Sequence, residues 1–360
     1  YAMYAENILQ DVERAAVNCG IPATEITEIK GRLYDFVATA TRPDYRVESI
    51  GDTIAEPIAK QFAVGDPRAE WLRSGGTRGA PPAMLYSYYD GGYVFGRAGW
   101  TPPAGSPDTF YSVRYSSTRP NTPHAHDDGA SMTLFSRGVS WIADPGPYRY
   151  ENGSGLRIFL RSRNAHSSFT VSNVARTKAN KVSKVVTTSD WPSGGNDNTC
   201  VRDRTWSNVV ITRCVTYVRS VDAVIVTDYV DAGKGKKRSR VVTERWQLPP
   251  GIGAEQVNGG LALTKDDKRL EVVKAGDGGW SVKTAKSGSS VGWHTAAWGE
   301  RVQGAVLMRE LRLPKAASNH VQVTVFVPRT AAEATPVTIA DGAVTITRGG
   351  TTVTTPLPRP

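Results

Sequence analysis

The most informative part of the sequence is Pro123–Val171, PHAHDDGASMTLFSRGVSWIADPGPYRYENGSGLRIFLRSRNAHSSFTV, in which polar residues at unusual spacing interrupt short apolar runs. It contains three of the five histidines, His124, His126 and His166. If His-Ala-His forms a strand, His124 and His126 point to the same side, because side chains alternate along a strand.

A hairpin is expected at Ser136-Arg137-Gly138, between two strand-like runs. It would fold Asp144 back toward His126, and the following strand-like stretch would bring His166 to the same place. Two imidazoles and one carboxylate are a usual ligand set for Zn²⁺ or a similar divalent ion, with water as a fourth ligand, and two histidines argue against Ca²⁺. His126, Asp144 and His166 are thus candidate metal ligands. The alternatives are an ordinary surface His-x-His pair and a turn aspartate before Pro145-Gly146.

Outward from this stretch, the two ends of the chain differ in character. Helix formers from about Glu6 to Val17 end at Cys19-Gly20, and a second helix is expected from Thr24, as N-cap, to just before Arg42-Pro43. After residue 76 the chain consists of short β-branched and aromatic runs separated by turn residues. The prediction is an α+β chain, with a helical segment at 1–75 and a mostly antiparallel β-sandwich at 76–360.

The formal net charge is +10, from 44 Lys and Arg against 34 Asp and Glu, which favours an anionic partner. The sequence has no zinc finger, RNA-binding signature or basic heptad helix, which argues against nucleic acid. It has no apolar run long enough to span a bilayer. Its start lacks the features of a signal peptide, as a mature or trimmed chain also would.

The three cysteines, Cys19, Cys200 and Cys214, show no metal-binding spacing. Cys200 and Cys214 flank two strand-like runs that turn near Ser207-Asn208, which would place them opposite each other. A disulfide there would indicate an oxidising compartment, and two separate buried thiols are the alternative.

The motif of the opening stretch resembles the signature of heparinase II/III-like polysaccharide lyases and their alginate-lyase relatives. The matching elements are His-x-His-x-Asp-x-x-Ser from His124, Asp-Pro-Gly-x-Tyr from Asp144, and Arg-Ser-x-x-Ala-His ending at His166. Looser similarity includes Gly51-Asp52 and Gly91-Gly92-Tyr93. The resemblance implies an N-terminal α/α toroid joined to an antiparallel β-sandwich, with a structural metal held by His126, Asp144 and His166. Residues 1–75 would then be the end of a truncated toroid.

The resemblance also implies β-elimination on a uronate-containing polysaccharide, with His124 at the catalytic cleft as base, acid or carboxylate contact. The family's Asn or His and Tyr from the toroid find no match here, so a separate helical domain or subunit is expected to complete the cleft. The anionic polysaccharide is the expected partner, Zn²⁺ the expected cofactor, and a secreted, periplasmic or cell-surface location is expected.

Several residues near the motif could bind acidic sugar, since Arg pairs well with carboxylate or sulfate and Tyr offers a hydroxyl. They are Tyr148, Arg149, Tyr150, Arg161 and Arg163. Strand packing is the alternative for the tyrosines, and solvated surface for the arginines. Other aromatic residues, Trp298 among them, could stack on sugar rings, although core packing is expected for most.

Two other functions remain open from the sequence. One is a noncatalytic carbohydrate-binding β-sandwich in which the metal only stabilises the fold. The other is a glycoside hydrolase, which needs two carboxylates across the scissile bond; Asp127 and Asp128 are adjacent and would face opposite ways in a strand. Loss of activity in His124→Ala with binding retained would separate enzyme from binding module, and an unsaturated product absorbing in the near ultraviolet would separate lyase from hydrolase.

Overall fold

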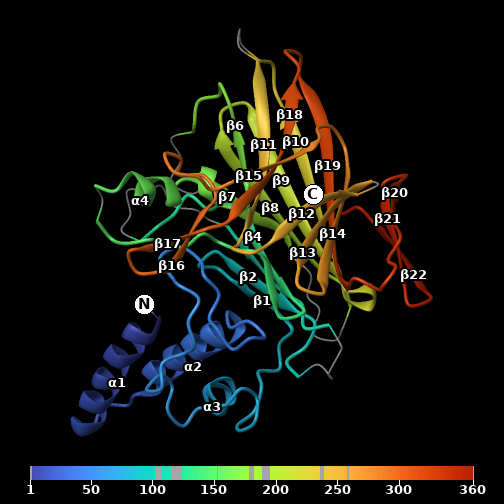
Figure 1. Cartoon of the computed structure of the whole chain (residues 1–360). Helices are drawn as coiled ribbons and strands as arrows, with labels where there is room; N and C mark the ends of the chain where they lie inside the picture. The colour runs from blue at the N-terminus through green and yellow to red at the C-terminus, as the bar shows by residue number, and fades with distance from the viewer. Residues whose placement is uncertain are drawn as a thin grey trace.

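The computed structural model describes residues 2–101, 107–115, 124–151, 153–177, 182–188, 195–235, 239–257 and 259–359. The fold is α+β and mostly antiparallel β, as the sequence predicted (Figure 1). A helical segment lies at one end of a large sandwich of sheets. Its helices are α1 (Ala2–Asn18), α2 (Thr24–Thr39) and α3 (Pro67–Arg73), while α4 (Gly155–Leu160) lies beside the sandwich.

Two sheets and a short strand pair flank the region of the opening motif. The five-stranded sheet has the order β1-β2-β3-β4-β5, made of Tyr86–Tyr89, Tyr93–Arg97, Phe110–Arg114, Ser131–Ser136 and Val139–Ile142. The four-stranded sheet has the order β15-β18-β11-β6, made of Trp280–Thr284, Ala305–Leu313, Arg240–Leu248 and Phe169–Val171. The pair is β16 (Trp293–Ala297) with β17 (Glu300–Gln303).

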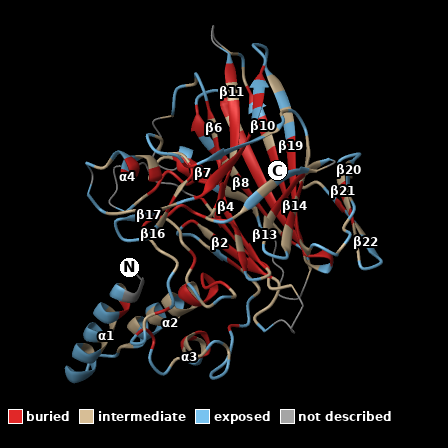
Figure 2. Ribbon diagram, viewed as in Figure 1, coloured by how far each residue is buried: buried red, intermediate tan, exposed pale blue. Residues whose placement is uncertain are grey.

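The largest sheet has eight strands in the order β12-β13-β14-β19-β10-β9-β8-β7. Its strands are Gly253–Val257, Gly260–Lys265, Lys268–Ala275, Ser318–Thr330, Ala223–Ala232, Val209–Val218, Asp197–Trp206 and Ser183–Thr188. One face packs on the five- and four-stranded sheets in a single apolar cluster, seen as the buried strands of Figure 2. The other face is covered by a three-stranded sheet of β20 (Val337–Ala340), β21 (Ala343–Arg348) and β22 (Thr351–Pro356). Alternating apolar residues on these strands account for both faces.

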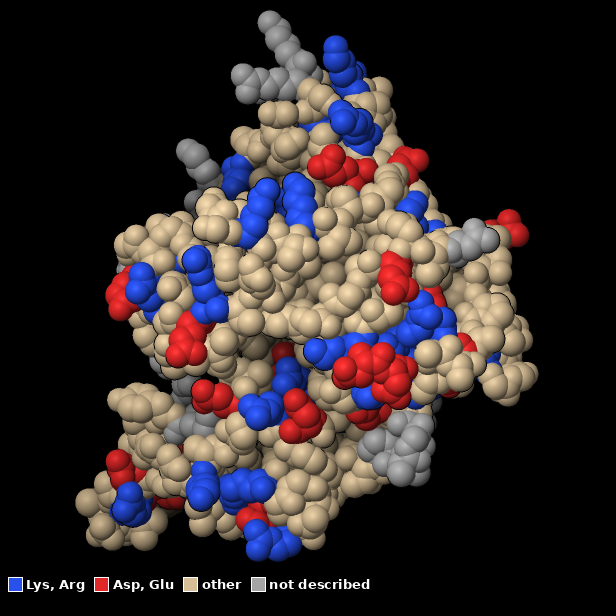
Figure 3. All heavy atoms as spheres, in the orientation of Figure 1, with Lys and Arg blue, Asp and Glu red and all other residues tan. Residues whose placement is uncertain are grey.

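The helical segment is attached to the sandwich through the end of α2. Phe36 and Ala40 pack on Phe95 and Phe110 of the five-stranded sheet. The buried guanidinium of Arg97 donates to the carbonyl oxygens of Thr39 at 2.7 Å and Thr41 at 2.9 Å, and so satisfies carbonyls at the helix end. Figure 3 shows the molecule hollowed between the helical segment and the sandwich, with basic and acidic side chains around the hollow.

The structure confirms some local predictions and corrects others. The hairpin at Ser136-Arg137-Gly138 joins β4 to β5, and Cys200 and Cys214 are paired across β8 and β9 and form a disulfide. Thr24 begins α2 but does not cap it, because the N-cap is Ala23 and its side chain has no oxygen to accept a hydrogen bond.

The expected strands at the metal motif are wrong in type. His124 and His126 lie in a loop that precedes β4, and the stretch before His166 forms α4 and a short 3₁₀ turn, Arg163–Ala165. Ser154 caps α4 by accepting from the backbone N–H of Arg157. Its glycine-rich approach and apolar positions Leu156 and Leu160, both buried, favour a short helix packed on the sandwich.

Candidate metal centre and adjoining cleft

His126, Asp144 and His166 come together although none lies on a strand. One ligand atom from each lies within 4.8 Å of the others, and all three residues are buried. His166 Nδ1 lies 2.7 Å from Asp144 Oδ2. His126 Nδ1 and His166 Nε2 are buried without a hydrogen-bond partner in the described part of the chain. Unpaired buried nitrogens are costly, and a divalent ion would satisfy them, so the donor set fits a metal such as Zn²⁺.

Asp52 lies at the centre of the site, where it contacts both His124 and His126, and its side chain is only 1% exposed. Its Oδ1 lies 2.7 Å from His126 Nε2, and its Oδ2 lies 2.9 Å from His124 Nδ1. Arg157 donates to both oxygens, at 2.5 and 2.9 Å. An ionised carboxylate only accepts hydrogen bonds, so each histidine holds its proton on the nitrogen that faces Asp52. This leaves His126 Nδ1 as the lone-pair nitrogen at the candidate metal site.

The charge of Asp52 is maintained by its donors. Burial alone would raise the pKa of this carboxyl, but hydrogen bonds from His126, Arg157 and His124 outweigh burial and hold the pKa below its usual range. Asp144 behaves alike: burial opposes ionisation, yet the attraction of His166 lowers its pKa. Both carboxylates are therefore ionised at neutral pH.

His124 connects the buried site to the cleft. Its side chain is 44% exposed, and its backbone has φ of 66°, in the left-handed region that only a few non-glycine residues adopt. Its ring meets that of Tyr150 edge-on, with centroids 5.4 Å apart. A histidine held by a carboxylate on one nitrogen, with its other edge toward a cleft, is suited to general base chemistry.

The cleft itself has a volume of 260 Å³ and lies between the helical segment and the five-stranded sheet. Phe36 and Val47 line its helical side, and Tyr93, Arg114 and His124 line the side of the sandwich. The residues around Asp52 form part of its wall, so the candidate site opens into this cleft.

Two buried arginines hold the loops that carry the histidines. Arg163 donates to Asp127 at 3.1 Å and to the Gly129 carbonyl at 2.8 Å, and it also pairs with Asp203. Arg213 forms a two-point pair with Asp228, with both distances 2.8 Å, and donates to the carbonyls of Ala130 and Ser167 at 2.9 Å. The sandwich interior thus fixes the segments next to His126 and His166.

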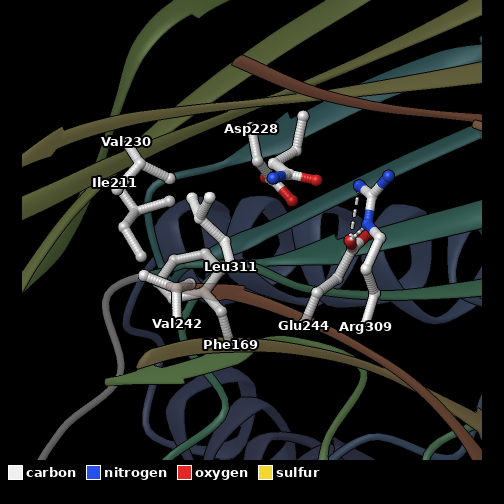
Figure 4. Close-up of a pocket in the computed structure, with 9 residues that line it drawn as sticks. Phe169, Ile211, Asp228, Val230, Val242, Glu244, Arg309 and Leu311 are labelled. Carbon is white, nitrogen blue, oxygen red and sulfur yellow. Dashed lines mark hydrogen bonds and ion pairs between the residues drawn. The ribbon is translucent and has the colours of Figure 1, made fainter. Parts of the chain in front are cut away.

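Asp228 belongs to a polar group enclosed between the sheets. Figure 4 shows it on the wall of a small internal cavity, where Glu244 and Arg309 form an ion pair beside apolar side chains such as Phe169 and Leu311. Arg309 Nε lies 2.8 Å from Glu244 Oε2. The charges are compensated within the core, as buried charges must be.

The residues proposed from sequence to bind sugar separate into two groups. Tyr150 is 47% exposed, Tyr148 and Arg149 are partly exposed, and Arg161 donates to the Ala125 carbonyl beside the histidines. The prediction for Arg163 is wrong, because its side chain is 1% exposed and its guanidinium is engaged by Asp127 and Asp203. Asp127 is likewise buried in ion pairs with Arg163 and Arg176, which removes it as a hydrolase carboxylate.

Sequence reasoning missed Asp52 and Arg157 as candidate site residues. Gly51-Asp52 was noted only as a looser similarity, and Arg157 had no assigned role. The only available signal was an acidic residue after Gly51, in the segment between α2 and α3. Spacing could not connect it to histidines more than seventy residues later.

The comparisons with known proteins agree with the observed fold. The family model described as heparinase II/III-like, C-terminal, matches residues 80–349. A heparinase III structure superposes with a TM-score of 0.79 at 16% identity, over 99% of this chain and 57% of that chain. The heparan sulfate lyase HepC from Pedobacter heparinus gives a TM-score of 0.77 at 16% identity, over 100% of this chain and 58% of that one.

The chain therefore spans less than two thirds of the length of these solved structures. No curated protein has a sequence that matches it. None of the helices in the described ranges has both the length and the apolar character needed to cross a bilayer.

Proposed function

The chain belongs to the heparinase II/III-like family, and we propose that it acts as a polysaccharide lyase that cleaves a uronate-containing polysaccharide by β-elimination. The observation that carries the proposal is the Asp52 carboxylate, which holds both His124 at the cleft and His126 at the metal cluster. This arrangement supplies an oriented imidazole where a sugar can reach it.

In the proposed reaction, the uronate carboxylate is neutralised, the C5 proton is removed, a C4–C5 double bond forms and the bond to the leaving oxygen breaks. His124 takes the C5 proton on Nε2, because Nδ1 holds its hydrogen against Asp52. We assign protonation of the leaving oxygen to Tyr150, whose ring contacts that of His124. Tyr148, Arg149 and Arg161 are assigned to sugar binding, through hydroxyl and guanidinium groups.

The helical segment offers an apolar surface for the domain expected to complete the cleft. Ile8 and Val12 of α1 are each 48% exposed, and Ile29 of α2 is 42% exposed. Apolar side chains on one side of surface helices favour contact with further helices. We propose that a helical domain packs there and provides further groups that bind the uronate carboxylate.

The metal is assigned a structural role. Held by His126, Asp144 and His166, a Zn²⁺ ion would tie together the loop before β4, the segment after β5 and the turn after α4. The disulfide is in keeping with an oxidising compartment, so we propose a secreted, periplasmic or cell-surface location.

The metal assignment predicts about one equivalent of zinc in the purified chain and its loss in His126→Ala, because removal of one of three protein ligands opens the site. Metal content by mass spectrometry of the dialysed proteins measures this. His320→Ala is the control, since His320 lies on β19 and bonds Ser318. Absence of metal from the wild type, or its retention in His126→Ala, contradicts the ligand set.

The proposed reaction predicts an unsaturated product. Heparan sulfate, alginate and hyaluronan are incubated with the chain alone and with an added helical domain from a heparinase, and absorbance in the near ultraviolet is followed. A rise with at least one polymer supports elimination. Reducing ends that accumulate without absorbance indicate hydrolysis, and binding without cleavage in both preparations favours the noncatalytic sugar-binding function.

A further inference from the structure

The turn between β16 and β17 carries a half-exposed tryptophan. Trp298 is 46% exposed, whereas the large tryptophans of the core, such as Trp141 and Trp246, are 0% exposed. Its ring lies 4.6 Å from that of Tyr150, which is 47% exposed itself. Two large aromatic rings thus contact each other at the surface, and packing in the core of the fold does not account for their presence there.

The turn is held firmly against the segment after Asp144. The backbone N–H of Thr295 donates to the Pro145 carbonyl at 2.8 Å, and its Oγ1 accepts from the Tyr148 N–H at 2.8 Å. The Gly299 N–H donates to the Tyr148 carbonyl at 2.7 Å. A Cβ on Gly146, which has φ of 75°, would approach Thr295 Oγ1 to 2.9 Å, so the two segments touch closely. These contacts therefore fix the position of the turn that carries Trp298.

Tyr150 joins this surface to the candidate base. Its ring contacts Trp298 on one side and His124 on another, with centroids 4.6 and 5.4 Å away. Next to it, Arg149 is 43% exposed and pairs with Glu151, which is 72% exposed. Ion pairs this exposed are weak, so an anionic group of a ligand can replace Glu151.

We propose that Trp298, braced against Tyr150, is a stacking subsite for a pyranose ring of an acidic polysaccharide, adjacent to the sugar that reacts at His124. The inference rests on the proposed function and extends it to a sugar beyond the reacting one. An amphipathic aromatic ring can cover the apolar face of a pyranose while the hydroxyls stay in water. Arg149 supplies the charge that favours a uronate or sulfated sugar over a neutral one.

The test is calorimetric titration of the full chain with tetrasaccharides of heparan sulfate and of alginate. Trp298→Ala is expected to weaken binding about tenfold, as loss of a well-placed aromatic contact does. Trp298→Phe, which keeps a stacking ring, is expected to stay within about threefold of wild type. Tyr88→Ala is the matched control, because Tyr88 is 43% exposed and is not among the residues that line the cleft.

The kinetic readout separates stacking from a general structural defect. In Trp298→Ala, KM is expected to rise about tenfold while kcat and metal content stay at wild-type values. Equal affinity of wild type and Trp298→Ala, failure of the wild type to bind either tetrasaccharide, or an equal loss with Tyr88→Ala would overturn the subsite. Tight, Trp298-dependent binding without unsaturated product, both from the chain alone and with the added helical domain, would keep the subsite and reject the lyase reaction, so the two proposals fail separately.

Discussion

Replacing His124 by asparagine is expected to lower the rate of formation of unsaturated product by about a hundredfold to ten-thousandfold, the usual contribution of a general base. Asparagine suits this position because it tolerates the left-handed backbone, here φ of 66°. Its side-chain amide can also donate to Asp52 in place of His124 Nδ1, which bonds Asp52 at 2.9 Å. The substitution thus removes the proton acceptor while keeping the local structure.

The decisive measurement is kcat beside metal content and tetrasaccharide affinity. Metal content and tetrasaccharide affinity are expected to match those of the wild type, because His126, Asp144 and His166 are unchanged. His320→Asn serves as control on a histidine remote from the site on β19. Undiminished turnover in His124→Asn would remove His124 as the base. A parallel loss of metal would instead assign it to the structure of the metal centre.

The sequence predicted the parts of the site that are close together along the chain. The turn at Ser136-Arg137-Gly138 is a local signal, and it correctly brings Asp144 back toward His126. The same local reasoning gave the wrong secondary structure before His166, because apolar residues at 156–160 fit a short helix as well as a strand. The three candidate ligands converge regardless, because reversals of the chain bring them together even though none of them lies on a strand.

Whether a side chain is buried was harder to predict from the sequence than which residues lie close together. Arg163 lies between two residues of the motif and has the chemistry to bind a sugar anion, yet it is buried against Asp127 and Asp203. Asp203 lies on β8, forty residues further on, and sequence gives no sign of that contact. A charge can be assigned to sugar or to core only after its partners in other strands are known.

The site is assembled across the junction of the helical segment and the sandwich. Asp52 follows α2, whereas its partners His124, His126 and Arg157 belong to the sandwich side. The packing of Phe36 and Ala40 on the five-stranded sheet, with Arg97 on the helix end, therefore also determines where the carboxylate lies. The packing of the helical segment on the sandwich therefore also orients the candidate base, His124.

Asp52→Ala is expected to lose both metal and activity, each by about tenfold to a hundredfold, the usual effect of removing a carboxylate behind metal-binding histidines. It also leaves the buried Arg157 cation without its partner, since that side chain is 3% exposed. Removal of one member of a buried pair costs about 3–5 kcal/mol of folding free energy. Chemical denaturation, metal analysis and the elimination assay measure the three effects.

Asp52→Asn separates the two tasks of the carboxylate, because each oxygen serves a different histidine. Oδ1 faces His126 and Oδ2 faces His124, at 2.7 and 2.9 Å, and an amide can present an acceptor to only one of them. If the amide oxygen faces His126, the metal content is expected to stay at the wild-type value while kcat falls. If it faces His124, the metal content is expected to fall more than kcat. Asp44→Asn is the control, as Asp44 precedes the same segment and pairs with Arg42. Wild-type metal content together with wild-type kcat in Asp52→Asn would show that the carboxylate orients neither ring.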